Sequence, residues 1–225
     1  MTPPRTRRLP SAVLFDMDGL LVDSEPMWFL AECQVVSELG GTWTKQHQEE
    51  LLGSNLEFAA DYMVRLTGCP HPPEEVAQML KHAMTAQLRE GDVTFLPGVE
   101  ALLAQLAAYA IATALVTSSV RDHLDVVLAA LPGHQFDVVV TGDDVTHKKP
   151  HPEPYLVALH GLGADAADCV VLEDSPAGVA SAEAAGCAVI AVPSVVSIPE
   201  GPNRLVVASL LDVDLDVLCD SLTRS

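Results

Sequence analysis

Residues 12–24 read AVLFDMDGLLVDS, an apolar run that ends in two aspartates one residue apart and then a glycine. A short continuous apolar run of this kind predicts a strand buried on both faces of a parallel sheet. Ligands of open α/β sheets bind where such strands end, so Asp16, Asp18 and Gly19 are candidate site residues. Two adjacent carboxylates repel each other unless a cation or a shared proton separates them. An ordinary turn, which Asp and Gly also favour, remains the alternative at this point.

The composition limits the classes of ligand. The 225 residues are enough for one or two domains, and 31 acidic against 12 basic residues give a formal charge of -19. Such a field predicts no binding to nucleic acid or to an anionic membrane surface. The five cysteines include no C-x-x-C pair, which predicts free thiols in a reducing cytoplasm.

Two stretches of the chain could suggest a signal peptide or a membrane span, and neither fits. The basic segment TPPRTRRLP, residues 2–10, precedes an apolar run that Asp16 interrupts, and this run is too short for a signal peptide. The Ala/Leu-rich residues 101–116 are too short and too polar for a membrane span. We therefore expect a cytoplasmic protein.

Beyond residue 95, apolar runs alternate with helical patterns, which predicts βαβ units and a parallel sheet. The strands expected there, the last of them weaker, are 111–116, 137–141, 169–173, 188–192 and 205–207.

Residues 24–95 differ from the rest of the chain. They show helical patterns broken at Gly- and Pro-rich segments, and no strand is expected. The expected fold class is therefore α/β, a Rossmann-like parallel-sheet core with an inserted all-helical cap. The core takes residues 1–23 and 96–225, the cap takes residues 24–95, and hinges are expected near 20–24 and 95–98.

Two of these expected strands end in polar residues. The strand 111–116 runs into Thr117, Ser118 and Ser119 before a helix, where hydroxyls and free amides form an anion site or simply cap the helix. The strand 169–173 ends in Glu173 and Asp174, which would bind a metal or favour the helix dipole.

The segment between these two strands carries a lysine pair, Lys148 and Lys149, before a proline. The proline favours an extended loop, and a lysine there would neutralise a phosphate or lie on a solvated surface. His147 and His151 have the spacing of zinc ligands on a helix, but Pro150 and the proline at 152 argue against a helix and so against zinc.

The carboxyl ends of parallel strands lie at one edge of a sheet, so these groups should converge. Carboxylates, a hydroxyl with amides and a lysine together suit Mg²⁺-assisted phosphoryl transfer through an aspartate nucleophile. In these motifs and their order the chain resembles the haloacid dehalogenase superfamily, in the branch with a helical cap after the first strand. Within it, residues 23–28 (DSEPMW) resemble the start of the cap in β-phosphoglucomutase-like sugar phosphatases, including hexitol and 2-deoxyglucose-6-phosphate phosphatases.

That resemblance implies a role for each motif residue. Asp16 would be the nucleophile, Asp18 the general acid and base, and Lys149 the group that balances charge between phosphate and nucleophile. Phosphate contacts are implied for Asp18, Gly19, Thr117, Ser118 and Lys149. Mg²⁺ contacts are implied for Asp16, Asp18 through its carbonyl, Asp174 and, directly or through water, Glu173. Lys148 matches no motif position and is expected at the surface.

The resemblance also implies the activity. We expect a Mg²⁺-dependent phosphatase for a small phosphorylated sugar or sugar alcohol, acting through an aspartyl phosphate, as a monomer or weak oligomer. A β-phosphoglucomutase-type mutase is the alternative, but such mutases carry an arginine where this chain has Leu56, followed by Glu57. Substrate choice is expected to involve the cap residues Glu25, Trp28, Gly53, Ser54 and Asn55.

Overall fold

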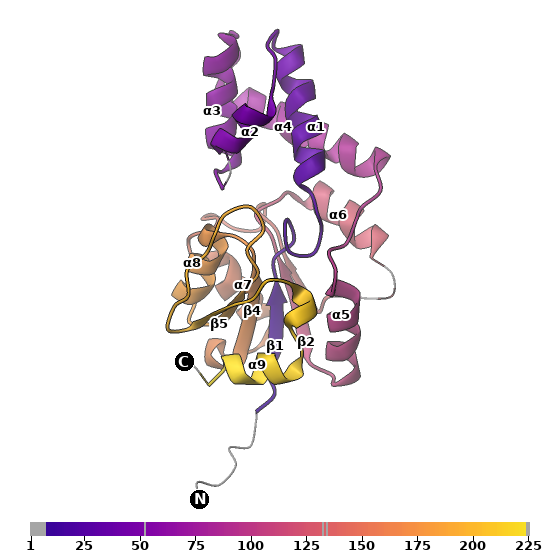
Figure 1. Cartoon of the computed structure of the whole chain (residues 1–225), viewed down its shortest axis with the longest axis vertical. Helices are drawn as coiled ribbons and strands as arrows, with labels where there is room; N and C mark the ends of the chain where they lie inside the picture. Colours follow the sequence, from indigo (N-terminus) through magenta and orange to yellow (C-terminus); the bar gives the residue numbers. More distant parts are fainter. Residues whose placement is uncertain (1–7, 52, 132, 134, 224–225) are drawn as a thin grey trace, which may run out of the picture.

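A six-stranded parallel sheet forms the centre of the computed structural model, which describes residues 8–223 except 52, 132 and 134 (Figure 1). The strand order is β3-β2-β1-β4-β5-β6, so the first strand lies in the middle. Each strand lies within one residue of its prediction: β1 Ala12–Phe15, β2 Ala112–Val116, β3 Val138–Val140, β4 Cys169–Glu173, β5 Ala188–Ala191 and β6 Arg204–Val206.

Alternate residues of the strands pack against helices on opposite faces of the sheet, as strand geometry requires. Leu14 of β1 lies in the core with α7 (Glu153–Leu162) and α8 (Pro176–Ala184). Phe15 lies in the core on the other face. That face is covered by α5 (Val99–Ala108), α6 (Arg121–Ala130) and α9 (Leu215–Ser221). Single 3₁₀ turns are at Ala166–Asp168 and Leu210–Asp212.

Four helices lie beyond the carboxyl edge of the sheet and pack mainly on one another (Figure 1). They are α1 Glu25–Glu38, α2 Lys45–Leu51, α3 Leu56–Thr67 and α4 Pro73–Glu90. Apolar residues at helical spacing, such as Leu80 and Met84 of α4, bury the faces between them. The predicted α/β class with a helical cap is confirmed. We call α1–α4 the cap helices.

Two chain segments connect the cap helices to the sheet, and they run side by side. The Asp23 amide donates to the Thr94 carbonyl at 3.1 Å, and the Leu96 amide donates to the Leu21 carbonyl at 2.9 Å. A further contact joins the two parts, because Nε2 of His123 on α6 lies 2.9 Å from the Lys81 carbonyl on α4. The hinges expected near 20–24 and 95–98 fall on the paired segments and remain a prediction.

The membrane and targeting predictions concern two parts of the chain. Among the described residues, none of the helices combines the length and the apolar character needed to cross a membrane. Residues 1–7, which include most of the basic N-terminal segment, lie outside the described residues.

Candidate active site

The structure brings the polar ends of β1, β2 and β4 together at the carboxyl edge of the sheet. Because these strands are neighbours in register, Asp16, Thr117 and Glu173 lie at the ends of adjacent buried strands. All three side chains are buried. The sequence therefore predicted the correct edge, and the distances below describe how the groups meet.

Lys149 joins the carboxylates of two strands. Its ammonium donates to Asp16 Oδ1 at 2.6 Å, to Glu173 Oε1 at 2.6 Å and to the Val116 carbonyl at 2.8 Å. Its side chain is only 5% exposed. An ammonium has three donors, so these three contacts use all of them.

Burial and repulsion between carboxylates raise the pKa of two acids in this cluster. Burial raises the pKa of Asp16 well above its ordinary value, and the charges of Glu173 and Asp174 add to the rise against the opposing effect of Lys149. Burial and Glu173 raise the pKa of Asp174 to about 7. Burial alone would lower the pKa of Lys149, but the charges of Asp16 and Glu173 raise it above its ordinary value. The cluster therefore has more carboxyl groups than its single lysine can neutralise, and this environment disfavours the charged forms of Asp16 and Asp174.

Glu173 is fully engaged by protein donors. Its Oε1 accepts from Lys149 and, at 2.6 Å, from the buried Tyr155 hydroxyl of α7, whose ring also lies under the Lys149 ammonium. Its Oε2 accepts from the Asp174 amide at 3.2 Å and from the Ser175 hydroxyl at 3.2 Å. These contacts orient Glu173 and leave it less suited than Asp16 or Asp174 to bind a metal directly.

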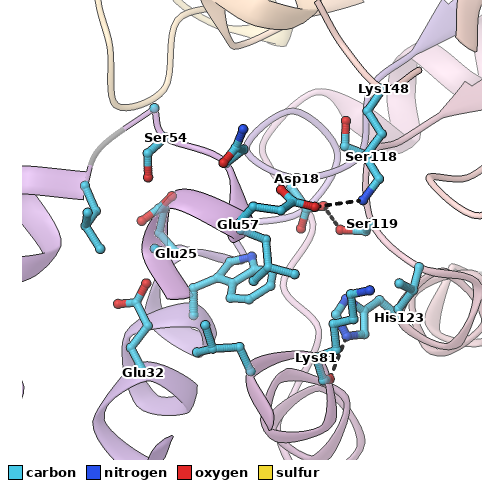
Figure 2. Close-up of a pocket in the computed structure, with 18 of the residues that line it drawn as sticks. Asp18, Glu25, Glu32, Ser54, Glu57, Lys81, Ser118, Ser119, His123 and Lys148 are labelled. Carbon is cyan, nitrogen blue, oxygen red and sulfur yellow. Dashed lines mark hydrogen bonds and ion pairs between the residues drawn. The ribbon is translucent and has the colours of Figure 1, made fainter. Parts of the chain in front are cut away.

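Asp18 lies on the other side of the same loop and is held by hydroxyls that follow β2. Ser119 Oγ donates to Asp18 Oδ2 at 2.7 Å, and Thr117 Oγ1 lies at the limit of reach, 3.5 Å. Figure 2 shows Ser118 and Ser119 beside Asp18 at the cavity. The α6 helix begins only after Val120, its N-cap, so the three hydroxyl residues form the loop before the helix.

Three buried carboxylates fit a metal ion. Asp16, Glu173 and Asp174 each offer an oxygen, and these oxygens lie within 4.8 Å of one another. Asp174 Oδ2 accepts from Ser194 Oγ at 2.5 Å, and Gly19 lies so close that a Cβ there would overlap this carboxylate. The sequence stretch 12–19 therefore needs glycine at position 19 for packing as well as for its positive φ of 78°.

A cavity of about 470 Å³ lies between the cap helices and the sheet edge, and Asp18 and Lys149 line its inner end. The cap residues expected to choose the substrate all line it: Glu25, Trp28, Gly53, Ser54 and Asn55. The oxygen of Asn55 also accepts from the Phe58 amide at 2.9 Å, so this residue caps α3.

Lys148 is partly exposed, as expected of a surface residue, but it also lines the cavity. Its side chain is 36% exposed, and its ammonium lies 3.7 Å from the Glu57 carboxylate of α3. Figure 2 shows this contact across the cavity mouth. The chain folds back from β3 toward the site, which brings both lysines, not only Lys149, to the cavity.

The histidine pair near this loop lies outside the cavity. His147 and His151 stack at a ring-centroid distance of 4.6 Å beside Glu153. Glu153 Oε2 already contacts His147 Nδ1 at 2.8 Å, and His151 Nδ1 accepts from the Glu153 amide at 3.2 Å. No helix spans the pair, as the prolines predicted.

Sequence reasoning missed Tyr155, Ser194 and Glu32, and it named Ser119 only as part of the hydroxyl run, with no role of its own. Ser119 belongs to the hydroxyl run after β2, so its type gave a weak signal. Tyr155 and Ser194 act through contacts with residues 18 and 20 positions away in the chain, and no local pattern reveals such contacts.

Comparisons with known proteins find relatives that match most of the chain. Hexitol phosphatase B of Escherichia coli K12 is 33% identical over 225 aligned residues, which cover 97% of this chain and 96% of that protein. Protein CbbY of Rhodobacter capsulatus is 36% identical over 195 residues, covering 81% of this chain and 85% of that protein. The crystal structure of CbbY from Rhodobacter sphaeroides in complex with phosphate matches with a TM-score of 0.80 at 28% identity, covering 91% of this chain and 96% of that one.

The family match itself spans residues 13–192, from the first strand to the end of the fifth. It includes the aspartate loop, the cap helices, both lysines and the Glu173–Asp174 pair. The chain belongs to the haloacid dehalogenase-like hydrolases and is a phosphoric monoester hydrolase of that family.

Proposed function

We propose that this chain is a Mg²⁺-dependent phosphatase that hydrolyses a small phosphorylated sugar or sugar alcohol through a phosphorylated Asp16. The observation that carries the proposal is the convergence of Asp16, Lys149 and Asp174 at one sheet edge, with Asp18 facing the cavity above them. The relatives named hexitol phosphatase B, and the phosphate bound to a CbbY structure, support the substrate class.

Asp16 is the nucleophile in this proposal. Lys149 holds its Oδ1 at 2.6 Å, and we assign attack on phosphorus to Oδ2. The bond from Asp16 to phosphorus forms as the ester bond to the sugar oxygen breaks. Lys149 then faces both the nucleophile and the incoming phosphoryl charge, which a buried ammonium stabilises more strongly than water does.

Asp18 is the general acid and then the general base. It gives a proton to the departing sugar oxygen, and then takes one from the water that attacks phosphorus and releases Asp16 and phosphate. The Ser119 hydroxyl at 2.7 Å holds the Asp18 carboxyl in position toward the cavity. Thr117, the Ser118 amide and the loop at Gly19 supply the donors for the phosphoryl oxygens.

The carboxylate cluster fits Mg²⁺, which prefers oxygen ligands and few protein carboxylates. Asp16, Asp174 and the Asp18 carbonyl would hold the ion, while Glu173, saturated by its own donors, would act by orienting Lys149 and the Asp174 amide. When bound, Mg²⁺ supplies positive charge that offsets the repulsion between carboxylates and phosphate.

The remaining expectations complete the proposal. The core is made of residues 1–23 and 96–225 and the cap of residues 24–95, and movement of the cap admits the substrate. The enzyme acts in the cytoplasm on a small phosphorylated metabolite, as a monomer or weak oligomer. Cys33, Cys69, Cys169 and Cys187 are free thiols, which is consistent with a reducing compartment.

Phosphatase assays with Mg²⁺ and with a chelator test the mechanism. The wild type should hydrolyse p-nitrophenyl phosphate and sugar phosphates only with Mg²⁺, and Asp16→Asn should abolish turnover. Asp23→Asn, the same change at an exposed position of the same segment, is the matched control. Acid-quenched wild type should carry phosphate on the peptide containing Asp16. Hydrolysis by Asp16→Asn at the wild-type rate would refute the nucleophile.

A further inference from the structure

One face of the first cap helix continues from the catalytic aspartates into the cavity. Glu25, Trp28 and Glu32 of α1 are three and four residues apart, so they share one side of the helix. All three line the cavity, and Figure 2 shows Glu25 nearer to Asp18 than Glu32 is. At 1.5 Å per residue, their backbones span about 10 Å along the helix. We call these three residues the α1 wall.

Glu32 occupies a position that a structural role does not explain. Its Oε2 accepts a hydrogen bond from Trp43 Nε1 at 2.9 Å, and the cavity around it includes the buried Leu51 and Leu80. Among the described residues, no lysine or arginine forms an ion pair with it. A carboxyl without a cation beside apolar side chains is costly to keep charged. A glutamine would accept the same hydrogen bond without that cost.

The rest of the wall adds acceptors and one aromatic face. Glu25 Oε2 accepts from Gln48 Nε2 at 3.3 Å, and burial, followed by the charges of Asp18 and Asp23, raises the pKa of Glu25. Trp28 lies between the two glutamates along the helix and also lines the cavity. Carboxylates bind hydroxyl donors with charge-assisted hydrogen bonds, and an aromatic face packs on the C–H groups of a sugar.

We propose that the α1 wall binds the hydroxyl groups at the unphosphorylated end of the substrate, and that Glu32 selects long polyhydroxylated monophosphates over short ones. This inference rests on the proposed function, because the phosphate must lie at Asp16 and Asp18 for the chain of the substrate to reach Glu32. Substrate length is then read along α1, from Glu25 near Asp18 to Glu32 at the far end of the wall.

Chemical groups other than hydroxyls, at the unphosphorylated end of the substrate, would fit the α1 wall less well. A second phosphate or a carboxylate would meet Glu25 and Glu32 with like charge. A purely apolar tail would cover both carboxylates without donating a hydrogen bond to either. A cationic group would be attracted to Glu25 and Glu32, but it would also meet Lys81 and Lys148, which line the same cavity. Neutral hydroxyls satisfy the acceptors of the wall without either penalty.

The test compares substrates of different length on Glu32→Gln. Removing one charge-assisted hydrogen bond should lower kcat/KM for sorbitol 6-phosphate about 10-fold or more. The change for glycerol 3-phosphate and p-nitrophenyl phosphate should stay below about 2-fold, since neither reaches Glu32. Glu38→Gln, on the same helix but outside the cavity, should leave all three substrates unchanged and controls for the loss of one charge.

Calorimetry separates this inference from the proposed function. Sorbitol 6-phosphate should bind the Asp16→Asn protein about 10-fold more tightly than it binds a double variant that carries both Asp16→Asn and Glu32→Gln. Failure of the wild type to hydrolyse any phosphate ester would refute the proposed function, and this binding comparison would still decide the role of Glu32. Equal losses on all three substrates, no loss on any, or preference for glucosamine 6-phosphate over glucose 6-phosphate would overturn the inference.

Discussion

The charge on Glu32 should lower the stability of the protein, and removing it should raise the stability in a pH-dependent way. Burial, opposed by the hydrogen bond from Trp43 and assisted by the charge of Glu25, raises the pKa of Glu32 from 4.5 to about 7. Between those two pH values the folded chain binds more protons than the unfolded chain. The free energy of unfolding therefore falls as the pH rises through this window.

The size of the effect follows from the shift. One pKa unit corresponds to about 1.4 kcal/mol, so above pH 7 the charged Glu32 costs about 3 kcal/mol. Glutamine stays neutral and still accepts from Trp43. Glu32→Gln should therefore be more stable than the wild type by about 3 kcal/mol at pH 8, and by only about 1 kcal/mol at pH 5.

Urea unfolding followed by tryptophan fluorescence measures this stability difference in the cap, where Glu32 lies. Both tryptophans of the chain, Trp28 and Trp43, lie in the cap helices and the loop between them, so fluorescence reports the cap. With a slope of about 3 kcal/mol per M for a chain of this size, the midpoint at pH 8 should rise by about 1 M.

Glu38→Gln removes the same charge from the solvent side of α1 and controls for the overall charge of -19. Its midpoint should match the wild type at both pH values. Equal midpoints for Glu32→Gln and wild type at pH 8, or a gap that does not shrink toward pH 5, would show that Glu32 is not held in the environment described above.

Three further variants test the catalytic cluster. Asp18→Asn should slow hydrolysis of sugar phosphates more than that of p-nitrophenyl phosphate, whose leaving group needs little protonation; equal losses, with phosphorylation of the enzyme rate-limiting, would exclude Asp18 as the acid. Tyr155→Phe should cost about 1–3 kcal/mol in urea unfolding, because Glu173 loses a buried donor. Gly178→Ala should cost about 1–3 kcal/mol and reduce kcat, because a Cβ there would overlap the Glu173 carboxylate; unchanged kinetics would argue that Glu173 does not orient Lys149.

The sheet and the cap helices could be predicted because their signals are local. Buried parallel strands read as continuous apolar runs, and β4 (Cys169–Glu173) was predicted to the residue. Glycines and prolines separated the cap helices correctly, as at Gly68, which closes α3 in the left-handed conformation. The motif residues at the strand ends could be placed because topology alone brings such ends together.

The contacts that complete the site could not be predicted in the same way. Ser119 donates to a carboxyl 101 residues earlier in the chain, and Lys148 meets Glu57 only because the cap helices fold over the sheet. Glu32 is one of several acids in an acidic chain, and nothing in its neighbours marks it as half-buried. Such contacts depend on how separate elements pack, and helical or strand periodicity carries no information about them.

The charge balance of the cluster indicates that one lysine would not be enough for the proposed phosphoryl transfer. Asp16, Asp18, Glu173 and Asp174 meet a single neighbouring ammonium, and Lys149 already uses its three donors on Asp16, Glu173 and the Val116 carbonyl. A phosphate dianion entering this site would either displace one of those contacts or bring uncompensated charge, which a buried site does not tolerate. In the proposed mechanism, Asp16 and Asp174 would hold a divalent cation that removes this conflict while the Lys149 contacts stay intact. Burial first, and the neighbouring carboxylates after it, raise the pKa of both aspartates, so the cost of charging them here is a physical argument for a metal in the proposed mechanism.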